Sequence, residues 1–432
     1  MSDSDAKIKS SPPGSTINAG FQVSPNNDWN WRAVLASALG MGFSQASIVV
    51  LSFGVFIYPL SAEFGWSRTQ ISFGLTISTL TLAAVTPVFG NLLDKYGFNR
   101  VLLISSCLFA LCFAAMALQH GNIIEFYIFM ALLPLLGAGT NSLTHTRTIS
   151  QRFTRKLGLA LGIAMSGVGV VSMIIPPVGQ FLVENLSWRY TYLFFAAAVL
   201  IVQLCAVCIL HFEKKIPLED DGDSSENEAD ISATASENSQ IRVFLALCRD
   251  QNFLVLTAIF LVLSTAITAT NVHLLPLLLD RGIESQSSAY VVSFVGLGLV
   301  IGRILAGVLM DYFFAPHIAL TLFALTAVGM IGIFADLSLI GLCLSAFVIG
   351  LGSATEMDLM AFMTARYFDP QHYGKIYGFF FLCFMIGASV GPLVMGMSFE
   401  YYGDYQIPML INTVMVIMAA LLTLFLGKYS SR

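Results

Sequence analysis

The sequence VVSFVGLGLVIGRILAGVLM, residues 291–310, contains twenty residues of which only Arg303 is charged. A helix of this length spans the roughly 30 Å hydrocarbon core of a bilayer, at about 1.5 Å of rise per residue. A guanidinium near the middle of a membrane helix costs about 2.5 to 3.5 kcal/mol on insertion scales, so it usually faces a polar cavity. We predict a transmembrane helix here, with Arg303 placed to bind an anion. The alternative is that Arg303 only pairs with a carboxylate such as Glu356 and fixes helix packing.

The composition extends this interpretation to most of the chain. Hydrophobic residues occupy 56% of the 432 positions and charged residues only 11%, whereas soluble domains carry about 25% charged residues. The sequence therefore predicts an all-α polytopic membrane protein. Twelve apolar runs are expected to cross the bilayer, near residues 32–60, 70–90, 101–119, 123–146, 157–183, 190–211, 252–279, 287–310, 316–335, 337–364, 374–398 and 406–427.

The distribution of charge predicts the orientation. With both termini in the cytoplasm, seventeen of the 21 Lys and Arg residues lie inside, as the positive-inside rule requires. Only Arg68, Arg189 and Arg281 then lie outside, and Arg303 lies in the membrane. We expect a multi-pass protein of the plasma (inner) membrane, divided into a disordered cytoplasmic tail 1–30, a six-helix bundle 31–212, an acidic cytoplasmic linker 213–250, a second six-helix bundle 251–427 and a cytoplasmic tail 428–432.

The two halves repeat each other. Gly90 and Asp94 in GNLLD correspond to Gly307 and Asp311 in GVLMD, 217 positions later. Several matches at a nearly constant offset indicate an internal duplication of six helices. Two such bundles with a cavity at their interface form the arrangement of alternating-access transporters. A second set of matches, at an offset of 216, joins Gly158, Gly162 and Pro176 to Gly374, Gly378 and Pro392.

The motif GNLLDKYGFNR, residues 90–100, resembles the loop signature of the major facilitator superfamily. The resemblance implies twelve transmembrane helices in two pseudo-symmetric six-helix bundles, and a gating role for this loop between helices 2 and 3. Gly90 would permit close helix approach, and the basic residues would anchor the loop at the headgroups. The matching residues are Gly90, Asp94, Lys95, Gly97 and Arg100.

A second motif, RFTRKLGLALGIAMSG at residues 152–167, resembles the start of helix 5 in the monocarboxylate transporter family. Arg303 also falls where that family, and the related oxalate and formate exchangers, place an arginine in helix 8. The chain is more similar to the bacterial branch, because Leu299 stands where animal members have an aspartate one turn before the arginine. The resemblance implies a carboxylate ligand role for Arg303 and leaves the proton-carrying residue open.

Two acids in GLGSATEMDLMAFMTARYF, residues 350–368, are candidates for proton coupling. Glu356 and Asp358 are two positions apart, about 200° around a helix, so only one is expected to line the cavity. If the two helices are centred near Leu299 and Leu351, the helical rise places Arg303 about 6 Å, Glu356 about 7.5 Å and Asp358 about 10 Å inward of the midplane. We therefore favour Glu356 as the acid that meets Arg303, with Asp358 as the alternative.

Other polar residues complete the candidate substrate site. His273 in NVHLLPLL resembles a His-x-x-Pro stretch of bacterial relatives, although a packed neutral histidine is the alternative reading. In the first half the predicted cavity residues are Gln45, Tyr58 and Asn141.

The motifs predict transport rather than catalysis. The sequence contains no HExxH, no GxxxxGK[ST] and no Cys–His cluster, so we expect no enzyme activity, metal or cofactor. The predicted function is secondary active transport of a small organic anion, in the first place a monocarboxylate, by proton symport or anion exchange. The expected partners are that anion, protons or a counter-anion, and the lipid bilayer, but no nucleic acid. The alternatives are an efflux pump for amphipathic drugs or metabolites and a transport-dead nutrient sensor.

Overall fold

The computed structural model describes residues 31–150, 157–212, 247, 249–369 and 372–428. The predicted tail 1–30, most of the linker 213–250, residues 152–156 of the second motif and the last four residues lie outside the described residues. Twelve helices of the described part are long and apolar enough to cross a membrane. The predicted all-α, twelve-span architecture is confirmed.

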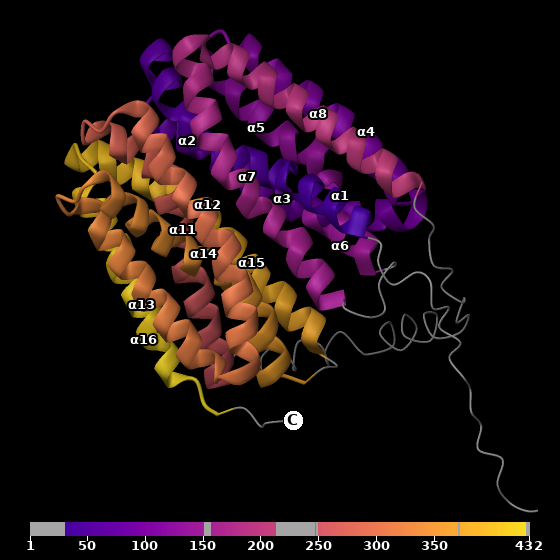
Figure 1. The fold of residues 1–432 in the computed structure, drawn as a ribbon, viewed down its shortest axis with the longest axis vertical. Helices are drawn as coiled ribbons and strands as arrows, with labels where there is room; N and C mark the ends of the chain where they lie inside the picture. Colours follow the sequence, from indigo (N-terminus) through magenta and orange to yellow (C-terminus); the bar gives the residue numbers. More distant parts are fainter. Residues whose placement is uncertain (1–30, 151–156, 213–246, 248, 370–371, 429–432) are drawn as a thin grey trace, which may run out of the picture.

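The helices form two sets that follow each other in the sequence and lie side by side (Figure 1). The first half, coloured indigo to magenta, contains α1 (Trp31–Gly42), α2 (Gln45–Phe64), α3 (Arg68–Tyr96), α4 (Phe98–Ala115), α5 (Ile123–Gly137), α6 (Ser142–Ser150), α7 (Leu157–Asn185) and α8 (Trp188–Phe212). The second half, coloured orange to yellow, contains α11 (Gln251–Asp280), α12 (Ser285–Tyr312), α13 (Ala315–Phe334), α14 (Leu339–Tyr367), α15 (Tyr373–Tyr402) and α16 (Gln406–Leu422).

The two ends of this helix array differ. Twelve spans separate Trp31 from Lys428, so these two residues lie on the same side. We call that side the terminal end and the opposite side the distal end. The distal end carries the short connections at residues 65–67, 119–122, 186–187, 281–284, 335–338 and 403–405.

Short capped turns fix the distal end. Gly65 ends α2 with φ +67° and Gly403 ends α15 with φ +80°, a left-handed conformation that glycine adopts without steric cost. Ser67 then opens α3 through a capping box with Gln70, which satisfies two of the free backbone groups at the helix start. The first residues of α3 and α16 are thereby held in defined positions.

Two of the predicted spans, 32–60 and 123–146, are interrupted within the membrane. The first is divided between α1 and α2, and the Ser44 side chain caps α2 by accepting a hydrogen bond from the Ser47 N–H. The second is divided into α5, the short 3₁₀ helix Ala138–Thr140 and α6. Hydropathy does not reveal such breaks, because a few small or hydroxyl residues between apolar runs leave the average unchanged.

The halves pack through glycines near the middle of the membrane. A Cβ at Gly169 of α7 would lie 2.7 Å from the Val300 side chain of α12, and one at Gly296 would overlap the backbone of Met173. At the distal end a Cβ at Gly396 of α15 would lie 3.1 Å from the backbone of Arg68 and Thr69. Small residues let helix backbones approach this closely.

The same helices separate toward the terminal end. A Cβ added at Gly90 of α3, Gly162 of α7, Gly307 of α12 or Gly378 of α15 would meet no atom of the described residues within 4 Å. The ribbons of the two halves also diverge toward this end (Figure 1). The predicted close approach at Gly90 is therefore not made in this conformation, and the interface between the halves is tight at the distal end and open at the terminal end.

We predict that Gly350→Ala lowers the stability of the protein by about 1 to 3 kcal/mol, the range observed for overpacked cores. The added methyl group would overlap the Val295 carbonyl of α12 and lie 2.9 Å from the Gly298 Cα. Thermal unfolding of the purified protein, followed by tryptophan fluorescence, measures the effect. Gly307→Ala is the matched control, because its methyl group would enter open space. Equal melting temperatures for the two variants would contradict the packing described here.

Candidate functional site

Arg303 lies on α12 where the halves begin to separate. Its Nε is 3.4 Å from Oδ2 of Asp358 on α14, and the two side chains are 18% and 23% exposed. Its Nη1 donates a 2.9 Å hydrogen bond to the Met165 carbonyl of α7, in the other half. Nε makes no hydrogen bond within the described part of the chain. Arg303 thus has a weakly held anionic partner, and its fork retains donors for a second anion.

The expected contact between Arg303 and Glu356 is wrong. Glu356 is only 3% exposed, and its Oε1 has no hydrogen-bond partner among the described residues. One turn earlier on the same face of α14, Gly352 packs against Leu322 and Thr326 of α13. Glu356 therefore faces the interior of the second half.

The position of Asp358 follows from the same helix geometry. Gly350 and Ala354 pack against α12, and Asp358 continues this line one turn later, because residues four apart share a helix face. The predicted opposition of the two acids holds. The acid that meets Arg303 is Asp358 and not the expected Glu356, because the small residues that face α12 share a helix face with Asp358.

Gln45 and Asn141 join the two interrupted spans. Asn141 Oδ1 accepts a 3.0 Å hydrogen bond from the Ala46 N–H, and Asn141 Nδ2 donates to Gln45 Oε1 at 3.4 Å. Thr140 Oγ1 accepts from the Gln45 N–H at 2.9 Å. These side chains satisfy backbone donors at the start of α2, within the membrane, where free N–H groups are costly. The structure brings these two predicted residues together in a helix-capping arrangement.

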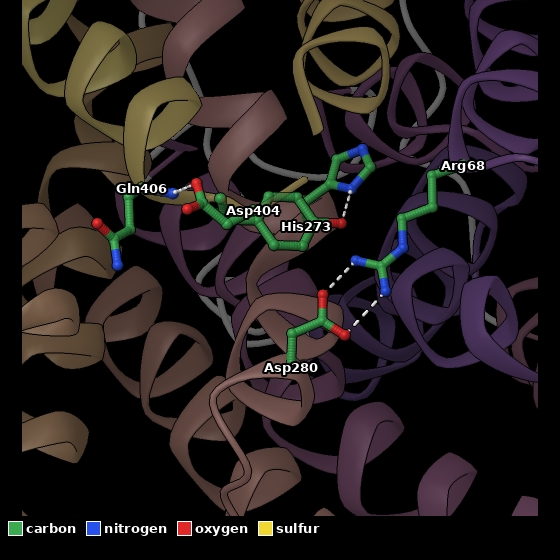
Figure 2. A network of polar contacts seen from close by, with 6 residues as sticks. Arg68, His273, Asp280, Asp404 and Gln406 are labelled. Atoms are coloured by element: carbon green, nitrogen blue, oxygen red, sulfur yellow. Dashed lines mark hydrogen bonds and ion pairs between the residues drawn. The ribbon is translucent and has the colours of Figure 1, made fainter. Parts of the chain in front are cut away.

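His273 lies near the distal end of α11, where its side chain contacts residues of both halves, and Figure 2 shows it beside the Arg68–Asp280 pair. It is fully buried, with Nδ1 2.9 Å from the Tyr405 hydroxyl and Nε2 3.0 Å from the Pro392 carbonyl and 3.2 Å from Ser72 Oγ. Since a carbonyl only accepts, we assign the proton to Nε2, and Nδ1 accepts from the Tyr405 hydroxyl. Burial raises the pKa of Tyr405, so this hydroxyl remains a donor at neutral pH. The contacts make His273 a link between α11, α15 and α3.

An ion pair adjoins this histidine and closes the distal end. Arg68 of α3 donates to both carboxylate oxygens of Asp280 of α11, at 2.5 and 2.8 Å (Figure 2). Its guanidinium also lies over the Phe399 ring, 3.9 Å from the centroid. A second clasp forms where Glu400 of α15 accepts a 2.8 Å hydrogen bond from the Thr69 N–H. We call Arg68, Asp280, Thr69 and Glu400 the distal gate.

The remaining predicted residues lie at the two surfaces. Tyr58 is 58% exposed and lines a hollow of about 500 Å³ at the distal end, together with Asp280 and Gln180. It is therefore separated from Arg303 along the membrane normal.

The predicted gating loop lies at the terminal end. Asp94, Lys95 and Arg100 are exposed, and Gly97 connects α3 to α4 with φ +77°. In this conformation Gly90 packs against no neighbouring helix.

Comparison with known proteins identifies the family. A family model described as Major Facilitator Superfamily matches residues 34–338 and 277–432. The chain belongs to the major facilitator superfamily.

Within this superfamily, the chain is similar to monocarboxylate transporters. It is 23% identical to mouse monocarboxylate transporter 1 over 434 residues, covering 93% of this chain and 85% of that protein. It is 25% identical to rat monocarboxylate transporter 2 over 320 residues, covering 72% of this chain and 63% of that protein. The predicted likeness to the monocarboxylate transporters is confirmed.

Solved structures of the superfamily share the fold. A D-xylose-proton symporter superposes with a TM-score of 0.71 at 13% identity, covering 91% of this chain and 97% of that one. The nucleoside transporter NupG superposes with a TM-score of 0.69 at 16% identity, covering 91% and 99%. At these identities the likeness concerns the fold alone.

The distal gate of this superfamily member was not foreseen from the sequence, although the duplication contains a signal for it. Glu63, at the end of α2, pairs with Arg189 within the first half at 2.7 Å. The positions 217 residues later are Asp280 and Gln406. The second half thus keeps the acid and lacks the arginine, which leaves Asp280 available to Arg68 of the first half.

We predict that Asp280→Asn opens the distal gate. A charge-assisted bidentate pair contributes more than a neutral hydrogen bond, and its loss should favour separation of α3 from α11. A cysteine introduced at the buried Ser72, beside His273, should then react on the order of tenfold faster with a membrane-impermeant methanethiosulfonate, which corresponds to about 1.4 kcal/mol.

The matched control is Asp404→Asn at the same end of the molecule. Asp404 caps the Gln406 N–H at 2.9 Å (Figure 2), and an amide oxygen can still accept that bond. An equal increase in labelling with both variants, or none with Asp280→Asn, would show that the ion pair does not hold the gate.

Proposed function

We propose that the chain is a secondary active transporter of a small organic anion, in the first place a monocarboxylate. The observation that carries the proposal is Arg303, a partly exposed guanidinium inside the membrane whose carboxylate partner makes no hydrogen bond to it. A permanent charge at this depth is costly unless it is paired or hydrated. A site with one fixed positive charge and one exchangeable acid fits a substrate with a single carboxylate. The names of the relatives, monocarboxylate transporters 1 and 2, support the same class.

We place the terminal end in the cytoplasm of a cell bounded by the plasma (inner) membrane. The excess of Lys and Arg on that side supports this orientation. In this conformation the distal gate is paired and the interface glycines of the terminal end are free of contact. The conformation is therefore an inward-facing one, in which Arg303 is reached from the cytoplasm.

Substrate binding is proposed to proceed by exchange at Arg303. The incoming carboxylate takes the guanidinium as a bidentate partner, a geometry that an arginine fork matches well. Asp358 then loses its counter-charge in a poorly hydrated site, which favours its protonated form. Release of the substrate restores the ion pair and expels the proton. Asp358, rather than Glu356, is the proposed coupling residue, because only Asp358 contacts Arg303.

Alternating access is proposed to use the two ends of the interface in turn. Opening of the distal gate would separate Arg68 from Asp280, and closure of the terminal end would bring α3 to α15 and α7 to α12 at their open glycines. Met165 and Arg303 lie between these two regions and contact each other across the halves. Binding of a ligand at Arg303 can thus shift the equilibrium between the conformations open at either end.

An efflux pump for amphipathic compounds is the second candidate, favoured by the partly exposed aromatic side chains of α15. A charged Arg303–Asp358 pair is poorly suited to a purely lipophilic substrate, and for that reason we rank anion transport first.

Arg303→Lys is predicted to lower carboxylate uptake at least tenfold while the protein still folds. The ammonium keeps the positive charge and loses the planar fork. Uptake of labelled lactate, pyruvate and phenylacetate into proteoliposomes measures the effect, with the melting temperature as the folding control. Wild-type uptake by a stable Arg303→Lys protein would exclude the proposed substrate role.

The coupling proposal predicts different defects for the two acids. Asp358→Asn should abolish uptake driven by a pH gradient and spare exchange of labelled for unlabelled substrate, because an amide cannot carry the proton. Glu356→Gln should retain both activities, since Glu356 lies away from Arg303.

The opposite pattern, with Glu356→Gln defective and Asp358→Asn normal, would move the proton to Glu356. If both variants keep gradient-driven uptake, neither acid couples the proton, and anion exchange becomes the mechanism.

A further inference from the structure

Helix α15 carries a continuous stripe of aromatic side chains in the half nearest the terminal end. Tyr373 and Tyr377 have ring centroids 5.8 Å apart and planes at 12°. The next pairs, Tyr377 with Phe381 and Phe381 with Phe384, have centroids 6.3 and 6.1 Å apart, each with planes at 15°. We call Tyr373, Tyr377, Phe381 and Phe384 the aromatic stripe. Its members are all partly exposed.

The stripe faces the centre of the molecule rather than lipid. At about 100° per residue, its four members fall within about 80° of one another. Ile386 and Val390, which are exposed, lie on the opposite side of α15, roughly 135° to 175° from the centre of the stripe by the same rule. Phe380 packs into the second half against Phe253 and Phe260. Gly378 shares the helix face of Ser389 and Gly396, both of which contact α3. The stripe therefore lies between the packed side of α15 and the gap that separates the halves.

The stripe also adjoins the charged site. Tyr377 lies within electrostatic range of Asp358, which is itself 3.4 Å from Arg303. Helices α14 and α15 are in contact. A ligand held by Arg303 can therefore extend along a row of aromatic rings without leaving the region that is open to the terminal end.

We propose that the aromatic stripe binds the apolar part of the substrate, and that the substrate is a monocarboxylate bearing a planar aromatic ring. This inference rests on the proposed carboxylate function of Arg303. A two- or three-carbon acid has too little apolar surface to cover four rings, whereas an aryl group stacks on such rings with a further gain beyond burial. The carboxylate supplies the fixed orientation at Arg303, and the stripe supplies the specificity.

Calorimetric titration of the purified full-length protein tests the proposal with three probes: phenylacetate, acetate and 2-phenylethanol. We expect phenylacetate to bind at least tenfold more tightly than either of the others. Phe381→Leu should weaken phenylacetate binding about 2- to 12-fold, the range of aromatic pair energies, and change acetate binding less than about twofold. Tyr377→Leu is the second variant, with the same expectation.

Phe379→Leu is the matched control. This substitution removes a ring from the same helix, but the ring of Phe379 stacks on Phe253 outside the stripe, with centroids 5.2 Å apart. Each variant is titrated at the same number of degrees below its own melting temperature. A weakening of phenylacetate binding by Phe379→Leu equal to that by Phe381→Leu would overturn the role of the stripe.

Two further outcomes separate this inference from the proposed function. If acetate binds as tightly as phenylacetate and both weaken in Arg303→Lys, the stripe proposal is overturned and carboxylate transport stands. If 2-phenylethanol binds as tightly as phenylacetate and Arg303→Lys changes neither, the carboxylate site itself is overturned, and the stripe proposal falls with it.

Discussion

A single arginine inside the membrane constrains the rest of this structure. Arg303 cannot lose its charge, so its neighbours must neutralise it, hydrate it or offer it to a ligand. Asp358 pairs with Arg303 at 3.4 Å, and the Met165 carbonyl accepts a hydrogen bond from Arg303 across the interface. The Arg303 side chain also stays partly exposed. Because α7 and α12 cross through Gly169 and Gly296 just distal to this point, the charge lies where the halves begin to separate. Binding of an anion to Arg303 is thereby coupled to the conformation of both halves.

The distal gate and the open terminal end are complementary. At one end, Arg68 and Asp280 form a bidentate pair beneath which His273 links α11, α15 and α3 through neutral hydrogen bonds. At the other end, glycines of α3, α7, α12 and α15 lie within 4 Å of no neighbouring helix in the part of the chain that the structure describes. The Arg68–Asp280 contact joins two specific charged side chains. Glycine surfaces instead let helix backbones approach each other without specific side-chain partners. The two kinds of contact suit an interface that must open alternately at its two ends.

Much of this architecture could be predicted from the sequence. Apolar runs of the right length indicated the twelve spans, and matching glycines and acids at a nearly constant offset indicated two halves, because both patterns can be recognised without knowing which helices are neighbours. The interruptions before Gln45 and Asn141 were missed, since hydropathy averages over the few residues that form a break. The choice between Glu356 and Asp358 required the identity of the neighbouring helix. The sequence indicates which face of the helix packs against a neighbour, because the small residues Gly350 and Ala354 lie one turn apart on the face that also carries Asp358. The pairing of Arg68 with Asp280 joins residues 212 positions apart, and only the missing arginine of the second half points to it.

The measurement that tests the central claim most directly is an experimental structure of the protein with phenylacetate bound. The account predicts that the ligand carboxylate contacts the Arg303 guanidinium with two hydrogen bonds, and that Asp358 has moved out of the 3.4 Å contact it makes in the free protein. A structure with the carboxylate bound elsewhere, and with the Arg303–Asp358 pair intact, would contradict it.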